Sequence, residues 1–166
     1  MEKIKIINIG GTFNKQYNPL NGELEVTQNN HIIESILHET YLTNEKPKVK
    51  GILFKDSLEL TNKDRKKIVE CIYNSKEDKI VIVHGTDTMH KTAKYVAKKI
   101  QNKQIVFTGA MVPYSISSIE ATGNLMLALG FLQNKGGKGV YFAMHGNVLK
   151  HDKMFKNREK GVFECL

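Results

Sequence analysis

The sequence contains little of several residue types on which particular classes of protein depend. Its 166 residues include 2 cysteines, 3 prolines and no tryptophan. Cys71 and Cys165 lie far apart and form no Cys-x-x-Cys pair, which excludes a disulfide framework and a cysteine-based zinc cluster. So few cysteines are typical of a reducing compartment, and we therefore expect a cytoplasmic protein.

Long hydrophobic stretches are also missing. The longest apolar run, residues 125–132, is much shorter than the ~20 residues that a membrane-spanning helix needs. The N-terminus alternates lysine with isoleucine and lacks the apolar centre of a signal peptide. We expect a soluble protein with no membrane partner, folded as one domain over residues 1–166, because this length is close to the usual domain size.

Acidic residues are outnumbered by basic ones, 17 against 25, which gives a formal net charge of +8. The lysines occur in local groups, the last of them within residues 150–160. Such a surface can attract nucleic acid or an anionic substrate. Only Phe155 lies among these cations, however, whereas binding of single strands uses several aromatic side chains. The composition therefore favours a solvated lysine-rich exterior over nucleic-acid binding, without excluding the latter.

Apolar patterning predicts alternating strands and helices. Runs rich in Ile, Val or Phe predict strands at residues 3–9, 48–54, 79–83, 104–108 and 138–144. The segment after Thr88 and the groups around Ile32 and Ile68 repeat apolar residues with a helical period. Residues 123–132 are apolar nearly all round, which predicts a helix buried on more than one side. This order predicts an α/β fold, a three-layer, doubly wound and mostly parallel sheet.

Glycines and polar residues follow every predicted strand. These turns occupy residues 10–12, 56–57, 84–87, 109–111 and 145–147. In a parallel sheet they all lie at the carboxyl edge, where ligands bind. Each turn alone is also explained as an ordinary chain reversal or helix cap. Similar chemistry at five turns instead favours one shared site.

Two threonine-containing segments of these turns resemble the signatures of the bacterial-type L-asparaginase family. The first is Ile-Gly-Gly-Thr at residues 9–12, and the second is Val-His-Gly-Thr-Asp-Thr-Met at residues 83–89. Further similarity lies at residues 56–59, 108–113, 123–125 and 144–147. The resemblance covers nearly the whole chain. Since family members usually have two domains, it implies that residues 1–166 correspond to the N-terminal catalytic domain, with no C-terminal domain.

The resemblance implies an asparaginase-type amidohydrolase that converts L-asparagine, or a similar small amide, to aspartate and ammonia through an acyl-threonine intermediate. Thr12 would be the nucleophile, with Tyr17 as the partner of its hydroxyl. Thr86 would be a second threonine, linked to Asp87 and a lysine in a relay. A threonine hydroxyl is a weak nucleophile at neutral pH, and it therefore needs such a base or cation, together with donors that face the oxyanion. Tyr17 is also explained as an ordinary turn residue.

The resemblance also implies the substrate contacts. Ser57 would hold the α-carboxylate, Asp87 the α-ammonium, and the region of Ala110 would face the leaving ammonia. The substrate-binding set is Gly11, Ser57, Gly85 and Ala110. No metal or organic cofactor is implied, and we interpret His84 and His145 as hydrogen-bonded structural groups. Glu120 is explained equally well as a brace for the buried helix and as a ligand contact.

The relay lysine has two candidates. In the family it follows an Arg-Asp pair, but the corresponding stretch here, residues 151–157, has no arginine. An alignment without gaps places Lys156 at the lysine position and leaves Lys153 as the alternative. Both lysines are also explained as part of a solvated basic tail.

Other departures from the family pattern concern the substrate. Leu58 stands where the family usually has a glutamine, and Val112 where it has an arginine. Alternative functions are therefore an amidase for another or a macromolecular amide, as in the asparaginase-like subunit of archaeal glutamyl-tRNA amidotransferase, and a non-catalytic domain that binds asparagine or aspartate. We expect a homodimer or higher homo-oligomer, because a single domain of this kind leaves an apolar face to cover.

Overall fold

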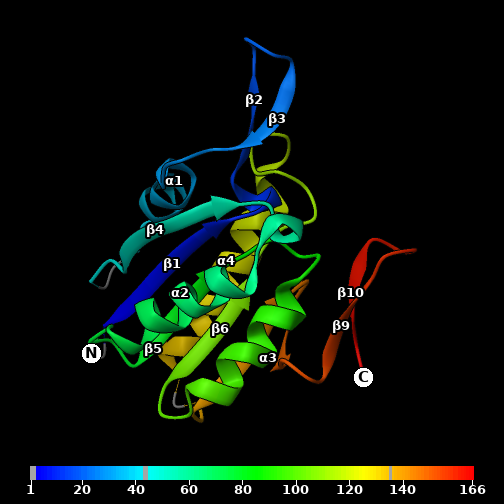
Figure 1. Ribbon diagram of the computed structural model, residues 1–166. Helices are drawn as coiled ribbons and strands as arrows, with labels where there is room; N and C mark the ends of the chain where they lie inside the picture. The colour runs from blue at the N-terminus through cyan, green and yellow to red at the C-terminus, as the bar shows by residue number, and fades with distance from the viewer. Residues whose placement is uncertain (1–2, 43–44, 135) are drawn as a thin grey trace.

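A central β-sheet organises the chain in the computed structural model, which describes residues 3–42, 45–134 and 136–166. Its strands run in the order β4-β1-β5-β6-β7-β8 (Figure 1). Their bounds are β1 (Ile4–Gly10), β4 (Lys48–Lys55), β5 (Lys79–Val83), β6 (Gln104–Thr108), β7 (Gly139–Met144) and β8 (Asn147–Lys150). The first five are parallel and β8 pairs antiparallel with β7. The predicted α/β fold with a mostly parallel sheet is confirmed.

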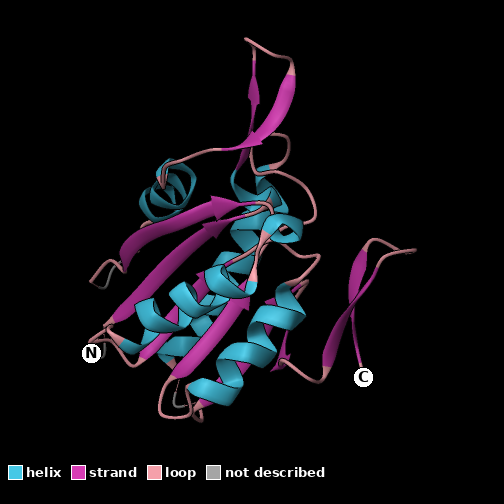
Figure 2. Ribbon diagram, viewed as in Figure 1, coloured by secondary structure: helices cyan, strands magenta, loops and turns pink. Residues whose placement is uncertain are grey.

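Helices cover both faces of this sheet. Helices α2 (Asn62–Tyr73) and α3 (Met89–Lys99) pack on one face, while α1 (His31–Glu39) and α4 (Ser118–Gln133) pack on the other (Figure 2). The connections β5–α3–β6 and β6–α4–β7 both step one strand in the same direction along the sheet, yet α3 and α4 lie on opposite faces, so these two crossovers have opposite hands. The three predicted layers are therefore present.

Alternation along the strands divides the core into two. In β5, Ile80 and Ile82 belong to the cluster beneath α2 and α3, whereas Val81 and Val83 belong to the cluster beneath α1 and α4. All four side chains are fully buried. This two-sided burial explains why the sheet strands are continuous Ile and Val runs rather than alternating apolar and polar residues.

Two hairpins extend from this layered body (Figure 1). The first, β2 (Lys15–Asn18) with β3 (Glu23–Val26), projects beyond the end of the sheet, and the second, β9 (Met154–Asn157) with β10 (Val162–Cys165), stands beside α3. The sequence analysis did not predict these strands or β8. They are only four residues long, partly exposed and interrupted by polar or charged residues, and so they lack the apolar runs that mark the sheet strands.

Helix α4 corrects one expectation. Its nearly uniform apolar composition predicted burial on more than one side, but only one face is fully buried, through residues such as Leu125 and Leu129. Gly123 and Gly130 are exposed on another face.

No helix within the described residues has both the length and the apolar character needed to cross a bilayer.

The core beneath α2 and α3 generates a stability prediction. Phe107 is fully buried and makes edge contacts with the rings of His84 and Phe142. We expect Phe107→Ala to lower the free energy of unfolding by about 3–5 kcal/mol, because it removes buried surface and leaves a cavity. Urea unfolding measures this. As a control, Tyr73→Ala at the exposed end of α2 is expected to change it by less than about 0.5 kcal/mol, and equal losses would contradict the assignment.

Candidate active site

Two glycine turns touch at the carboxyl edge of the sheet. Gly11 follows β1 and Gly85 follows the neighbouring strand β5. A Cβ atom at Gly11 would collide with the backbone of Gly85, and a Cβ at Gly85 would lie 2.7 Å from the Cβ of Ser57. Gly11 also has a φ of 75°, which favours glycine. The turns therefore pack backbone to backbone, and Thr12 and Thr86 each follow this contact by one residue.

The second hairpin brings a lysine to Thr86. Lys156 on β9 donates a hydrogen bond of 2.8 Å from Nζ to Thr86 Oγ1 and one of 2.9 Å to Asp87 Oδ1. Thr86 is buried and only 15% of the Lys156 side chain is exposed. Lys153, the alternative lysine, lies in the exposed turn before β9. Of the two candidates, Lys156 is the one that meets Thr86 and Asp87.

Thr12 opens the short helix η1 (Thr12–Asn14) and is half-buried. Among the hydrogen bonds of the described residues, none engages its hydroxyl, which leaves that group available to a ligand. Tyr17 lies on β2 with 63% of its surface exposed, and its hydroxyl faces the turn at Gly22. The structure therefore places the predicted partner of Thr12 on the projecting hairpin rather than against the threonine.

Ser57 joins the turn after β4 to the start of α3. It begins the short helix η2 (Ser57–Glu59), and its hydroxyl oxygen accepts a 3.2 Å hydrogen bond from the Thr88 backbone N–H. Thr88 in turn donates its hydroxyl to the Ser57 carbonyl at 2.7 Å. Among the described residues the Ser57 hydroxyl donates to no acceptor, so its hydrogen is free to be donated to an anion.

A buried guanidinium lies behind this pair. Arg65 is 7% exposed and donates to Thr88 Oγ1 at 3.3 Å, to Thr92 Oγ1 at 3.1 Å and to the Leu60 carbonyl at 3.2 Å. Within the described part of the chain no carboxylate forms an ion pair with it. The side chain thus contributes a nearly uncompensated positive charge beneath Ser57. Its place three residues before Ile68, on the buried side of a helix, was a signal in the sequence that had not been used to predict this role.

Asp56 adds a negative charge on the other side of the same turn. Its carboxylate pairs with Lys15 Nζ at 2.9 Å and accepts the Leu58 backbone N–H at 3.1 Å, as an N-cap does. Partial burial raises the pKa of Asp56, but these two hydrogen bonds outweigh that effect. The charges of Lys15 and Lys156 lower the pKa further, so that the net shift is downward and Asp56 is ionised at neutral pH.

His84 is a fully buried neutral imidazole beneath the site. Its Nδ1 lies 2.7 Å from the Gly85 carbonyl, which can only accept, and its Nε2 lies 2.8 Å from the Thr92 hydroxyl. The network therefore assigns the proton to Nδ1. Burial lowers the pKa of His84 to about 4, and the charge of Arg65 adds to this effect. The expectation that His84 is a hydrogen-bonded structural group agrees with these contacts.

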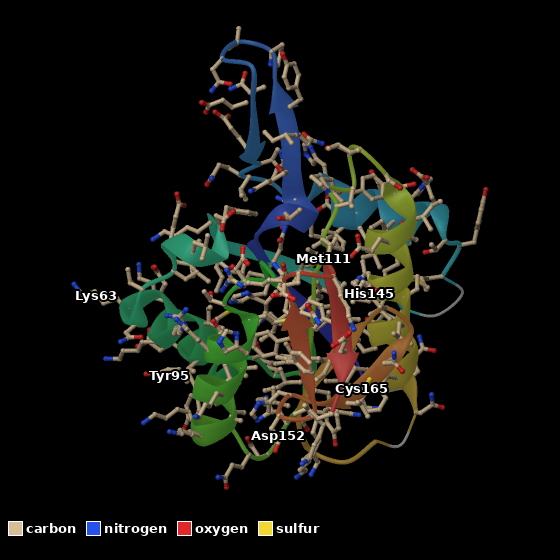
Figure 3. All side chains as sticks on the ribbon, turned by 90° about the vertical axis from the view of Figure 1, so that its right-hand side faces the viewer. Lys63, Tyr95, Met111, His145, Asp152 and Cys165 are labelled. Atoms are coloured by element: carbon tan, nitrogen blue, oxygen red, sulfur yellow. The ribbon has the colours of Figure 1, made fainter. Side chains whose placement is uncertain are left out.

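Glu120 braces the turn after β6. Its two carboxylate oxygens accept the backbone N–H groups of Met111 at 2.8 Å and Val112 at 3.0 Å, and one of them also lies 2.8 Å from His145 Nε2. Met111 and His145 lie near each other beside the second hairpin in Figure 3. Glu120 is engaged as a brace, which is one of its two expected roles. Ala110, in the same turn, is fully buried.

The structure also adds a residue that the sequence analysis did not single out. Arg158 Nη2 lies 3.2 Å from Asp87 Oδ1, the oxygen that also receives Lys156. These three residues, with Thr86, border a cavity of about 180 Å³ whose walls include Phe155 and other phenylalanines. Arg158 lies in the turn that follows β9, so no strand pattern in the sequence indicated its contact with Asp87.

The arrangement combines the parts that acyl transfer requires. It has a free hydroxyl at Thr12, a hydroxyl at Thr86 held by an ammonium group, and a carboxylate at Asp87 that fixes this ammonium. The hydrogen-bonded chain of Thr86, Lys156 and Asp87 can move a proton to and from a reacting atom. The Ser57 hydroxyl and the Arg65 charge beneath it suit the binding of an anion nearby.

Comparison with known proteins gives a consistent family assignment. Residues 3–162 match the family described as "Asparaginase, N-terminal". The L-asparaginase of Thermococcus kodakarensis is 36% identical over 87 residues, which are 51% of this chain and 26% of that protein. A glutamyl-tRNA(Gln) amidotransferase subunit of Nanoarchaeum equitans is 29% identical over 146 residues, covering 86% of this chain and 36% of that protein.

A solved structure extends the likeness to the whole fold. The thermostable L-asparaginase from Thermococcus kodakarensis superposes with a TM-score of 0.84 at 25% identity, and the match covers 99% of this chain and 51% of that one. The chain thus spans about half the length of the asparaginase to which its fold is similar. The resemblance expected from the threonine motifs is confirmed.

The pKa of His84 generates a prediction for stability against pH. An unfolded histidine has a pKa of about 6.5, whereas the folded value is about 4. Between these values the unfolded chain binds more protons, so that stability falls as pH decreases from 6.5 to 4. Between pH 7 and pH 5 we expect the free energy of unfolding of the wild type, measured with urea, to fall by about 2 kcal/mol more than that of His84→Gln. Parallel pH profiles for the two proteins would contradict this account.

Proposed function

The chain belongs to the asparaginase N-terminal family, and from this membership and the geometry of its sheet edge we propose that it is an asparaginase-type amidohydrolase. In this proposal it hydrolyses L-asparagine or a similar small amide to the acid and ammonia. The observation that carries the proposal is the position of Lys156 Nζ, 2.8 Å from Thr86 Oγ1 and 2.9 Å from Asp87 Oδ1. The described residues would form the catalytic domain.

In the first step the Thr12 hydroxyl oxygen attacks the amide carbonyl carbon. Its proton moves to Thr86 Oγ1, the Thr86 proton moves to Lys156 Nζ, and Lys156 passes one of its own protons to the Asp87 carboxylate, while backbone N–H groups of the glycine turns stabilise the oxyanion. The carbon–nitrogen bond then breaks, the nitrogen takes a proton from the relay, and ammonia leaves. The product of this step is an ester between the acyl group and Thr12.

Water completes the reaction in the second step. The same relay removes a proton from a water molecule, which attacks the ester carbonyl, and the Thr12 oxygen regains a proton as it leaves. Asp87 keeps Lys156 in place through both steps, because its carboxylate pairs with the ammonium at 2.9 Å. No metal or organic cofactor takes part in the proposed sequence.

The substrate carboxylate is proposed to bind at Ser57. The Ser57 hydroxyl has its hydrogen free for an acceptor, and the buried Arg65 charge lies behind it. Gly11 and Gly85 would allow the substrate to approach the backbone, and Ala110 would face the leaving ammonia. For Tyr17 to serve as the partner of Thr12, the projecting hairpin would have to turn toward the sheet edge.

Location and assembly complete the proposal. Cys165 is exposed and Cys71 is half-buried, and both are free thiols, which suits the reducing cytoplasm. Ile116, in the turn before the apolar helix α4, and Ile119, in its first turn, are 63% and 82% exposed. We propose a homodimer through this exposed apolar surface.

The threonines give a direct prediction. Thr12→Ala removes the attacking oxygen and Thr86→Val removes the hydroxyl that transfers its proton, and each is expected to abolish ammonia release from L-asparagine. A coupled ammonia assay measures this, with circular dichroism to verify the fold. Full turnover by Thr12→Ala would contradict the acyl-threonine mechanism.

The two lysines allow a matched comparison. Lys156→Met removes the relay ammonium while keeping the side-chain length, and kcat is expected to fall by about 10²- to 10⁴-fold, the usual contribution of general acid–base assistance. Lys153→Met changes the same residue type in the same segment, at an exposed position. It is expected to leave kcat within about twofold of the wild type. Equal effects of the two substitutions would show that Lys156 has no relay role.

A further inference from the structure

Resting on the proposed function, we infer that the substrate is an amide that carries a carboxylate but no free α-ammonium group, and that Arg158 sets this preference. The class includes amides without an α-amino group and asparagine derivatives whose α-nitrogen is acylated. The inference starts from Asp87, the carboxylate that would otherwise receive an α-ammonium group.

Asp87 is already occupied by two cations of the protein. Its Oδ1 receives Lys156 Nζ at 2.9 Å and Arg158 Nη2 at 3.2 Å. Its Oδ2 has no hydrogen-bond partner within the described part of the chain. A substrate ammonium would therefore have to share one carboxylate with two positive groups, and one carboxylate balances only one of them.

Cations outnumber carboxylates at the sheet edge. Asp87 is the only acidic residue among those that border the 180 Å³ cavity, whereas Lys156 and Arg158 both border it. On the other side Asp56 is neutralised by Lys15, and Arg65 is buried behind Ser57 without a carboxylate among the described residues. With Glu120, which braces the turn after β6, four cations thus face three carboxylates. This excess attracts an anion and opposes a bound ammonium.

The surroundings of Asp87 also suit an uncharged substituent. Phe142, Phe155 and Phe163 line the cavity that Asp87 borders. An acyl group on the α-nitrogen removes the ammonium charge and presents an apolar surface to such walls. An α-carbon without nitrogen removes the charge with no added volume. Both kinds of amide avoid competition with Arg158 for Asp87.

The effect of Arg158 is expected to be moderate. Its side chain is 64% exposed and that of Asp87 is 30% exposed, so that solvent screens part of their interaction. Partly exposed ion pairs change affinities by a few-fold rather than by orders of magnitude. Removing Arg158 should therefore shift the preference toward L-asparagine by roughly three- to tenfold.

The test compares three amides: L-asparagine, N-acetyl-L-asparagine and succinamate, the analogue without the amino group. For the wild-type chain we expect kcat/KM for succinamate or N-acetyl-L-asparagine to equal or exceed that for L-asparagine. Arg158→Gln is expected to raise the ratio of L-asparagine to succinamate by roughly three- to tenfold. A wild-type preference for L-asparagine of tenfold or more over both other amides would overturn the inference.

Lys160→Gln is the matched control. Lys160 lies on the same hairpin, is 66% exposed and pairs with Glu164 rather than Asp87, at 2.7 Å. Both substitutions replace one cation of this hairpin with a neutral side chain. Lys160→Gln should leave the ratio within twofold of the wild type. If Arg158→Gln and Lys160→Gln change the ratio equally, overall charge rather than the Asp87 contact is responsible, and the inference fails.

A binding measurement separates this inference from the proposed function. Calorimetry with succinate and with L-aspartate compares the product anions without turnover. The inference is supported if succinate binds more tightly than L-aspartate and Arg158→Gln shifts the ratio of the two affinities toward L-aspartate. This holds even if no amide releases ammonia, because that result would refute only the proposed hydrolase activity. Binding of neither anion, tighter binding of L-aspartate, or a ratio that Arg158→Gln does not change would overturn the inference.

Discussion

The direct backbone contact between the turns after β1 and β5 is the constraint on which the rest of the site depends. Gly11 and Gly85 lack the Cβ atoms that would hold the turns apart, and Ser57 packs against the second glycine. Parallel pairing of β1 with β5 puts both turns at one edge. The threonines that follow the glycines therefore belong to the same small region, and the polar groups from β4, β5 and β9 surround it.

Buried charge beneath this region is satisfied by hydroxyl groups instead of carboxylates. Arg65 donates to Thr88 and Thr92, and the Thr92 hydroxyl faces the neutral ring of His84. An arginine buried without an acid is expensive unless its donors are satisfied, and here three of them are, the third by the Leu60 carbonyl. The same network fixes the Gly85 carbonyl through His84, so that the turn carrying Thr86 rests on a rigid polar support.

Sequence patterns predicted the layers of the fold better than its hairpins. The strand predicted at residues 79–83 coincides with β5, because burial on both faces demands an unbroken apolar run. Hairpin β2–β3 carries no such run. It projects from the body, and Tyr17 is therefore exposed on it and lies away from Thr12. An alignment without gaps favoured Lys156 over Lys153 as the relay lysine, and in the structure Lys156 contacts Thr86. The pairing of Arg158 with Asp87 depends on how β9 docks beside α3, which local patterns do not encode.

The C-terminal hairpin is attached to the body by two kinds of contact. On β9, Lys156 joins it to Asp87 through charge; on β10, Phe163 is buried against the rings of Phe142 and His145, and its N–H reaches His145 Nδ1 at 3.3 Å. Dissolved ions weaken the first kind and leave the second largely intact. Met154 on β9 is buried in the same core cluster as Phe163, and the Lys156 side chain is only 15% exposed. Rising ionic strength would therefore weaken mainly the contact of the 64% exposed Arg158 with Asp87, while both strands stay anchored.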